Sequence, residues 1–309
     1  MRNNSFAEKE SYCQFLFDQK GPFWHIATPG NLTEILFTDT DDYRYAQSQL
    51  AIGSVQCGLK TYAFQLMTNH LHDIVGAPSP QPCMDILEFL AARFKRYFSL
   101  KGRPVDLSSF VCEPLPISSI QALRNHIVYT HRNKYVVDAS QTPFSYPWGS
   151  GSLYFGEDPV NFKSTRYNDL TKREQKLITS SRIITLPDWF TVRNGCISPE
   201  SFCDWRTGKS FFRDAHQYFN MLGKNYEAYA EFASLLGDTV TLTDEELYSA
   251  ACQLARQQYN AASPSQLSDG AKKDLAKKLH FDHHAGNNQL RRILKLDPFV
   301  LESMFPQAQ

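Results

Sequence analysis

Residues 23–76 alternate short β-type runs with a helical pattern, and this alternation constrains the fold more than any other feature of the chain. The runs FWHIAT and TEILFT flank the turn signal Pro-Gly-Asn, so each of them favours a strand. Residues 38–42 supply cap residues for a helix that runs to about Val55. KTYAFQLM then leads through a Thr-Asn pair into HLHDIV, which together predict two further strands. We therefore expect a domain of mixed helices and strands.

The rest of the chain is expected to be mostly helical. Helical patterns cover residues 85–100 and 118–136, and a segment rich in Pro, Gly and aromatics at 140–154 is expected to close the domain. Asn194-Gly195 lies between β-type residues and predicts a hairpin. The expected organisation is a lead-in at 1–20 anchored by Tyr12, Phe15, Leu16 and Phe17, a domain at 21–155, a linker, hairpin and helical scaffold at 156–235, and a helical module at 236–309.

Composition limits where such a chain can work. The 309 residues carry no formal net charge, so nucleic-acid contacts must come from local patches. No stretch approaches the roughly 18 consecutive apolar residues of a membrane span, and the N-terminus lacks the apolar run of a secretory signal. The seven cysteines show neither CxxC nor zinc-finger spacing. We expect a cytoplasmic protein without a membrane partner.

The pair His70 and His72 is the first candidate for chemistry. Alternate side chains of a strand share a face, so the two imidazoles are expected side by side, where both can bind one divalent cation. Most His-x-His pairs are surface or packing residues, and catalysis needs a third ligand and open positions. By itself the pair is weak support for a metal site.

The helix expected from about Ser118 offers two groups that would complete such a site. Its apolar stripe is predicted to pack on the sheet, and Tyr129 lies off that stripe. Asn133 follows four residues later, so both side chains share one helix face. The alternative is that Tyr129 is a partly buried aromatic residue and Asn133 a helix C-cap.

Several motifs resemble those of single-tyrosine HUH transposases, particularly the REP-associated tyrosine transposases. QLMTNHLHDIV resembles the family's "LMPNHxHLL" strand, VYTHRNKYVV its "YIHLNPVRAGLV" helix, and TPFSYPWGSGSLYF its "YPWSSY" closing motif. FWHIAT, the acidic TDTDDY and the basic ARFKRYFSL follow the family's order. The resemblance covers about residues 20–155. It implies an α+β fold with an HUH-type antiparallel, ferredoxin-like sheet and packed helices.

The resemblance also implies roles for four residues. His70 and His72 match the metal ligands, Tyr129 matches the nucleophile, and Asn133 matches the residue that supplies a further ligand. The implied activity is cleavage and transfer of single-stranded DNA through a 5′-phosphotyrosine at a hairpin-bearing element. The implied cofactor is a divalent metal, Mg²⁺ or Mn²⁺, acting as a Lewis acid on the scissile phosphate.

The sequence departs from the family pattern at three positions. Thr68 replaces a proline, Asp73 replaces an apolar residue, and Lys134 replaces a proline. None of these changes removes a ligand or the nucleophile. Tyr97, which also follows the histidine pair on a helix, is the fallback nucleophile.

Two basic regions are candidates for holding DNA. Arg93, Lys95, Arg96 and Lys101 are interleaved with aromatic residues, a composition that suits phosphate contacts and base stacking. The alternative is an ordinary helix with its aromatics inward and its charges in solvent.

The second basic region is the C-terminus. It is expected to form a helix, a turn at Gly286, a short helix 287–294 with Arg291 and Arg292, and a last helix from about Pro298. This order resembles a helix-turn-helix module. Such helix pairs also occur simply as packing units.

Three functions remain open from the sequence. The first is an active DNA nuclease and strand transferase, and the second a transposase-derived, sequence-specific DNA-binding protein that no longer cuts. The third is a metal-dependent hydrolase of small molecules, which leaves the basic regions unexplained. Both a monomer and a dimer with shared sites are compatible with the sequence.

Overall fold

The computed structural model describes residues 2–30, 35–137, 142–156, 162–181, 184–224, 244–283 and 285–306. The chain divides into two compact units, the first built mainly from residues 1–135 and 140–225 and the second mainly from residues 239–309. Each unit has its own hydrophobic core. Among the described residues, no helix combines the length and the apolar character needed to cross a bilayer.

An antiparallel sheet forms the centre of the first unit. Its strands, in the spatial order β2-β3-β1-β4, are β1 (Phe23–Ala27), β2 (Lys60–Leu66), β3 (Leu71–Gly76) and β4 (Leu115–Ile117). Every neighbouring pair is antiparallel. The expected α+β class with an antiparallel sheet and packed helices is therefore confirmed.

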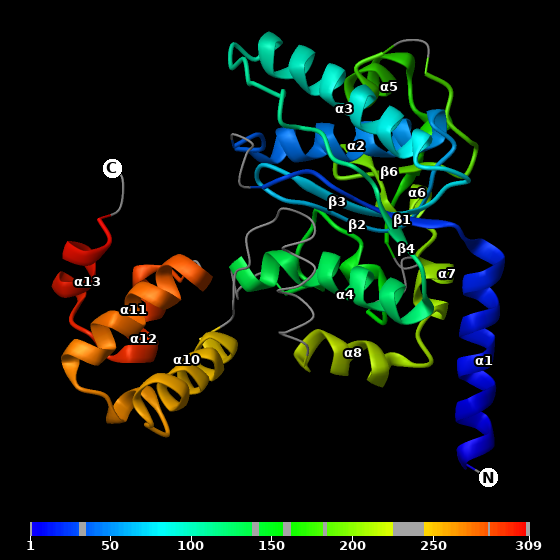
Figure 1. The fold of residues 1–309 in the computed structure, drawn as a ribbon. Coiled ribbons are helices and arrows are strands. Elements are labelled where there is room, and N and C mark those ends of the chain that lie inside the picture. The colour runs from blue at the N-terminus through cyan, green and yellow to red at the C-terminus, as the bar shows by residue number, and fades with distance from the viewer. Residues whose placement is uncertain are drawn as a thin grey trace. The chain divides into compact units, whose positions relative to one another are not determined.

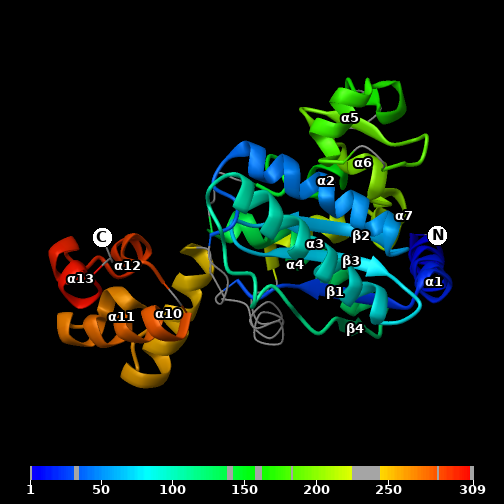
Figure 2. The ribbon, with the colours of Figure 1, turned by 90° about the horizontal axis from the view of Figure 1, so that it is seen from above.

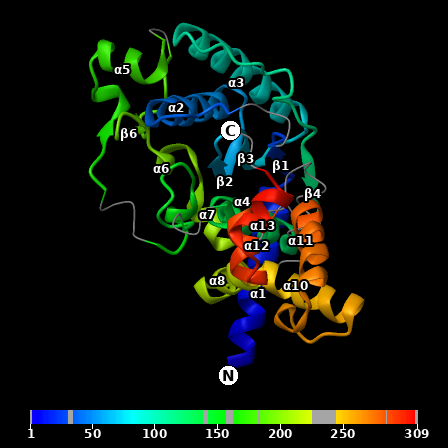
Figure 3. The same cartoon turned by 90° about the vertical axis from the view of Figure 1, so that its left-hand side faces the viewer.

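Helices cover both faces of this sheet. They are α2 (Thr40–Gln56), α3 (Gln81–Leu100) and α4 (Ile120–Val137). Figures 1 and 3 show α2 and α3 on one face and α4 on the other, and Figure 2 shows α2 and α3 lying across the strands. Leu123 and Ile127 of the expected α4 stripe are fully buried. The apolar stripe thus directs α4 onto the sheet.

One predicted strand is wrong. In TEILFT, residues 35–38 form no strand, and the residues before Ile35 lie outside the described part. Leu36 and Phe37 are buried, and both of their amide groups donate to the carbonyl of Thr68, at 3.0 and 2.9 Å. The apolar, β-type residues of this run are therefore buried against the turn at Thr68 and do not pair in the sheet. The fourth strand is β4, whose sequence LPI carries too short a signal to predict.

The lead-in is the helix α1 (Arg2–Lys20), and its expected anchor is confirmed only in part. Tyr12 and Phe15 are each 57% exposed. Cys13 is buried instead, and Phe17 stacks on Phe23 with ring centroids 5.1 Å apart.

The described middle of the chain, from residue 142 to 224, belongs to the first unit and includes the expected hairpin and helices, where a linker was also expected. It contains η1 (Gly151–Leu153), β5 (Thr165–Arg166), η3 (Tyr167–Asp169), α5 (Lys172–Thr179), β6 (Thr191–Arg193), β7 (Cys196–Ile197), α6 (Pro199–Phe202), α7 (Trp205–Ser210) and α8 (Ala215–Lys224). Phe190, Val192 and Ile197 share a core with Ala51 and Ile52 of α2.

Two turn features behave as the sequence predicts. The Asn194-Gly195 hairpin forms between β6 and β7 with φ of 53° and 81°, the left-handed values that this turn requires. The aromatic tail closes the sheet, because Trp148 accepts from the Leu66 amide at 2.8 Å and the Ser150 amide donates to Phe64 at 3.0 Å.

The second unit is helical, as expected. It consists of α10 (Asp244–Tyr259), η4 (Pro264–Gln266), α11 (Asp269–His283), α12 (Asn287–Leu294) and α13 (Pro298–Met304). Lys295 ends α12 with a φ of 55°. The predicted bounds of α12 and the start of α13 are confirmed.

Asp73 is a buried acid on the α2/α3 side of the sheet. It is 1% exposed, accepts from the Thr61 hydroxyl at 3.3 Å, and its Oδ1 has no hydrogen-bond partner among the described residues. Burial raises the pKa of Asp73 well above its ordinary value. The departure from the family pattern at this position therefore lies on the face opposite α4.

We expect the substitution Asp73→Asn to stabilise the protein at pH 8 by about 1–3 kcal/mol, because the amide cannot ionise. Since the folded-state pKa is raised, the stability contributed by neutral Asp73 is complete below about pH 4 and is lost as the pH rises through the folded-state value. Urea unfolding from pH 5 to 8 should show a gap between variant and parent that widens with pH. Asp41→Asn, at a side chain 74% exposed, is the matched control, and a gap independent of pH contradicts the assignment.

Candidate functional site

His70 and His72 lie side by side on the face of the sheet that α4 covers. His70 directly precedes β3 and His72 is the second residue of that strand. Their ring centroids are 5.1 Å apart. Both side chains are buried, His70 at 7% and His72 at 0% exposure.

The turn before β3 orients the His70 ring. The Asn69 amide nitrogen donates to the carbonyl of Gly30, so its Oδ1 faces His70 and accepts from His70 Nδ1 at 2.7 Å. A neutral imidazole that donates from Nδ1 carries its lone pair on Nε2. His70 is therefore held in the tautomer suited to binding a metal through Nε2.

His72 belongs to a buried chain of hydrogen bonds. Its Nδ1 is 3.2 Å from Nε2 of His25, and Nδ1 of His25 is 2.8 Å from Nδ1 of His126 on α4. On its other side, His72 Nε2 is 2.8 Å from the Asn133 amide nitrogen. Burial, with a smaller effect of His72, lowers the pKa of His126 to about 4. His126 is therefore neutral at pH 7.

Tyr129 packs against the same imidazoles. Its ring meets the His72 ring edge to face at 5.5 Å and the His25 ring at 6.3 Å. Asn133 follows one turn later on α4 and bonds His72. The structure thus brings together the four residues that the sequence analysis placed in one site. Tyr129 is nevertheless 7% exposed, so little of it faces solvent.

The donor set allows a test of the implied metal. A cation about 2.1 Å from each ring nitrogen would hold two imidazole centroids about 5 Å apart, close to the observed 5.1 Å. Within the described ranges, no group of three or more His, Cys, Asp and Glu side chains is placed to hold a metal. A bound ion would therefore depend on His70, His72, the Asn133 amide oxygen and water. Two imidazoles suit Mn²⁺ better than Mg²⁺, which prefers oxygen ligands.

His25 and His126 are the site residues that sequence reasoning missed. A signal for each was present. His126, Tyr129 and Asn133 are spaced by three and four residues and so share one helix face. His25 is the polar exception in a strand whose other inward residues, Phe23 and Ala27, are apolar.

The basic helix α3 has its aromatics inward, as the alternative interpretation states. Phe94 and Phe98 are fully buried, which excludes base stacking on them. Lys95 and Arg96 are exposed, whereas Arg93 is half-buried with its guanidinium 5.1 Å from the Phe89 ring centroid. Of the candidate DNA contacts on α3 itself, Lys95 and Arg96 are the accessible ones.

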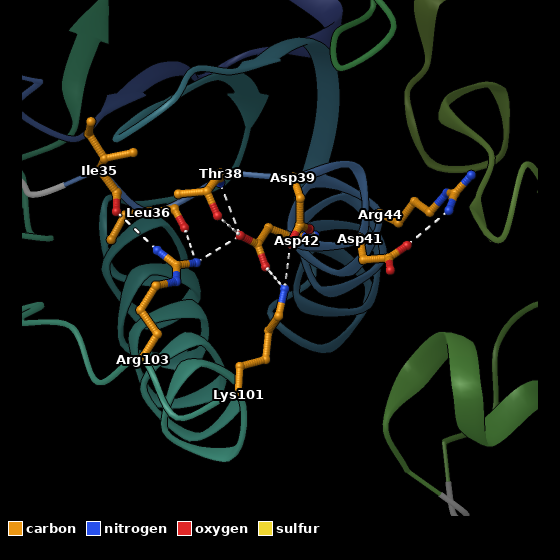
Figure 4. Close-up of polar contacts among 9 residues, drawn as sticks. All are labelled: Ile35, Leu36, Thr38, Asp39, Asp41, Asp42, Arg44, Lys101 and Arg103. Carbon is orange, nitrogen blue, oxygen red and sulfur yellow. Dashed lines mark hydrogen bonds and ion pairs between the residues drawn. The ribbon is translucent and has the colours of Figure 1, made fainter.

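Lys101 is not available for DNA, because it belongs to a cluster around the buried Asp42 (Figure 4). Lys101 Nζ lies 2.6 Å from one oxygen of Asp42, and an Arg103 nitrogen lies 2.7 Å from the other. Although burial raises the pKa of Asp42, hydrogen bonds from Lys101 and Thr38 outweigh it and hold that pKa below its ordinary value. Asp42 is thus an ionised anchor for both cations.

The Asp42 cluster also binds residues 35–36, which contact the turn that precedes His70. Arg103 donates to the carbonyls of Ile35 and Leu36, at 3.2 and 2.7 Å (Figure 4). The Leu36 amide in turn donates to Thr68, two residues before His70. Backbone hydrogen bonds therefore connect the ion pairs around Asp42 to the turn that precedes His70.

Tyr97, the fallback nucleophile, lies on the wrong side of the sheet. It belongs to α3 and stacks on Tyr45 with ring centroids 4.0 Å apart. Burial, helped by the nearby Asp42, raises the pKa of Tyr97 to about 12. The structure therefore gives Tyr97 a packing role.

In the second unit, Arg291 and Arg292 are exposed on α12, while Leu290, Ile293 and Leu294 face the core. The last helix, α13, carries no Lys or Arg, and Phe299 on it is 85% exposed. In the pair formed by α12 and α13, the basic side chains are therefore on α12.

We expect Asp42→Ala to lower the free energy of unfolding by about 2–4 kcal/mol, since it leaves two partly buried cations without their carboxylate. Asp41→Ala is the matched control one position away. Its pair with Arg44 is exposed at 2.9 Å and should contribute less than about 1 kcal/mol. Urea denaturation of both variants measures the difference, and equal losses would contradict the anchor role of Asp42.

Comparisons of the chain with protein-family models, with curated proteins and with solved structures found no match.

Proposed function

We propose that this protein is a metal-dependent endonuclease and strand transferase of single-stranded DNA, with Tyr129 as nucleophile and a hairpin-bearing element as substrate. The observation that carries this proposal is the placement of Tyr129 and Asn133 of α4 against the His70–His72 pair. A phenol, two imidazoles and an amide converge there from a strand end and one helix face.

The topology supports the HUH-type interpretation. The first unit runs β1-α2-β2-β3-α3-β4, with the spatial order β2-β3-β1-β4. A β-α-β-β-α-β order of this kind is that of ferredoxin-like folds. In this arrangement β1 and β3 are the central strands, which gives His70 and His72 a rigid support.

The proposal assigns a role to each residue of the site. A divalent cation, when bound, would supply Lewis-acid activation of the scissile phosphate. His70 and His72 would hold it through Nε2, and Asn133 would turn its amide oxygen inward. The Tyr129 oxygen would bond to the scissile phosphorus as the bond from phosphorus to the 3′-oxygen breaks, and the proton lost by the phenol to water would be balanced by one that the 3′-oxygen takes up. The phenolic proton must leave first, because the ordinary pKa of tyrosine is near 10.

The accessible cations also fit this function. β3 begins at the histidine pair, and α3 returns across the sheet to the same end, as the bonds from Arg103 to Leu36 require. Lys95 and Arg96 lie on the last two turns of this helix, on the other face of the sheet. In a helix-turn-helix pair the first helix crosses the backbone, so Arg291 and Arg292 suit phosphate contacts.

The second candidate is a DNA-binding protein derived from such an enzyme, with cutting lost. The low exposure of Tyr129 favours it, and so does the hydrogen bond by which Asn133 occupies His72 Nε2. An active enzyme has to break that bond and uncover the phenol before it cuts.

The deciding experiment is incubation with labelled single-stranded hairpin DNA and Mn²⁺, followed by denaturing electrophoresis. We expect a covalent protein–DNA adduct that Tyr129→Phe abolishes and the matched control Tyr97→Phe retains. Binding without an adduct in the parent protein supports the second candidate. If the protein does not bind DNA, the remaining candidate is the third function, a metal-dependent hydrolase of small molecules.

The salt dependence of DNA affinity tests the proposed phosphate contacts. We expect Lys95→Ala and Arg96→Ala each to reduce the slope of log affinity against log salt for a single strand by about 0.7. Arg291→Ala and Arg292→Ala should each reduce the slope for a duplex by about 0.9. Lys101→Ala should leave both slopes unchanged, because Asp39 and Asp42 neutralise its charge. A reduced slope in Lys101→Ala would contradict this assignment.

A further inference from the structure

His25 and His126 form a buried pair that no step of the proposed chemistry uses. They are 0% and 2% exposed and link α4 to His72 through the contacts at 2.8 and 3.2 Å. An apolar pair would fill the same space without needing hydrogen-bond partners. What His25 and His126 add over apolar side chains is therefore their hydrogen bonds, each of which has a donor and an acceptor end.

That direction follows from proton counting. A neutral imidazole donates from one ring nitrogen and accepts at the other. If His72 Nε2 accepts from Asn133, then His72 Nδ1 donates to His25 Nε2. His25 must then carry its proton on Nδ1 and donate to Nδ1 of His126. The amide nitrogen of Asn133, by donating to His72, thus determines which ring nitrogen carries the proton in His72, His25 and His126.

We propose that His25 and His126 are positioning residues that hold His72 in its Nδ1–H tautomer, so that the Nε2 lone pair faces a divalent cation. His70 is held the same way by Asn69, and the two imidazoles thus present equivalent nitrogens. The cation itself rests on the proposed function. The tautomer does not, because it is a property of the metal-free protein.

Reversing donor and acceptor in each of these hydrogen bonds shows which form of His72 the three-histidine chain prevents. With every proton moved to the other nitrogen, His72 would carry a proton on Nε2 and require the oxygen of Asn133. Protonated Nε2 cannot bind a metal. The contact of Tyr129 with both His25 and His72 adds a packing constraint on the ring planes.

The test is nitrogen-15 NMR of the imidazole rings in the metal-free, full-length protein, with His72 assigned by its loss in His72→Gln. We expect parent His72 to be protonated on Nδ1. His25→Leu should convert it to a mixture or to the Nε2–H form, whereas His25→Gln keeps an acceptor and should restore Nδ1–H. His126→Leu removes the imidazole that bonds His25, and it should also give a mixture of the two His72 tautomers. This variant replaces His25→Leu in the test if His25→Leu does not fold.

His131→Leu is the matched control. It removes another fully buried imidazole from α4, one that bonds Tyr218 and Ser150, and it should leave His72 unchanged. A parent His72 protonated on Nε2 overturns the proposal. So does a tautomer that both His25→Leu and His126→Leu leave unaltered.

Titration with Mn²⁺ alone separates this inference from the proposed function. We expect His25→Leu to weaken Mn²⁺ binding by about 10- to 100-fold, as loss of a ligand's hydrogen-bond partner does, and His25→Gln to recover most of it. A parent protein that shows the Nδ1–H tautomer but binds no Mn²⁺ retains the positioning role and removes the nuclease proposal. If the parent binds Mn²⁺ and His25→Leu binds it with the same affinity, the positioning role is overturned.

Discussion

The antiparallel register between β1 and β3 is the constraint on which the candidate site depends. It pairs Ala27 with His72 and His25 with Ile74, so both imidazoles point toward α4. A slip by one residue would turn them to the α2/α3 face and bring Asp73 against α4. Thr28 holds the register at the site end, because it donates to the Leu71 carbonyl and its hydroxyl accepts from the Leu71 amide. The site is therefore a consequence of strand pairing.

The buried polar chain from Asn133 to His126 contributes little net stability compared with an apolar interface of the same shape, and it stabilises the fold only while every member keeps its partner. Each buried polar group left without a partner costs about 1–3 kcal/mol, whereas a satisfied hydrogen bond contributes only about 1 kcal/mol. A fold selected for stability alone would place apolar side chains between the sheet and α4. Departures of this kind from local rules concentrate at functional sites. His72 and Asn133 belong both to this buried chain and to the residues matched by the motif resemblance.

Much of the fold was predictable because it rests on local patterns. The α4 stripe, the Asn194-Gly195 hairpin and the helix at 287–294 each follow from spacing and turn chemistry. TEILFT failed because burial against the Thr68 turn, a long-range contact, gives the same apolar signal as a strand. His70, His72, Tyr129 and Asn133 were found by spacing and resemblance. His25 stands out in the sequence only as the polar residue of an apolar strand, and its place beside His72 arises from the pairing of β1 with β3.

The covered geometry of the site is compatible with both proposed functions, a nuclease and a DNA-binding protein that no longer cuts. The Asn133–His72 hydrogen bond occupies the nitrogen that a cation would use, and Tyr129 is largely covered. A neutral hydrogen bond contributes only about 0.5–1.5 kcal/mol net, so binding of a cation by two preoriented imidazoles can displace it. Uncovering Tyr129 carries a larger cost, because an aromatic ring must leave contacts with two imidazoles. Under the proposed function, bound DNA would have to supply the energy for that step, so uncovering of Tyr129, more than metal binding, would separate the proposed nuclease from a DNA-binding descendant.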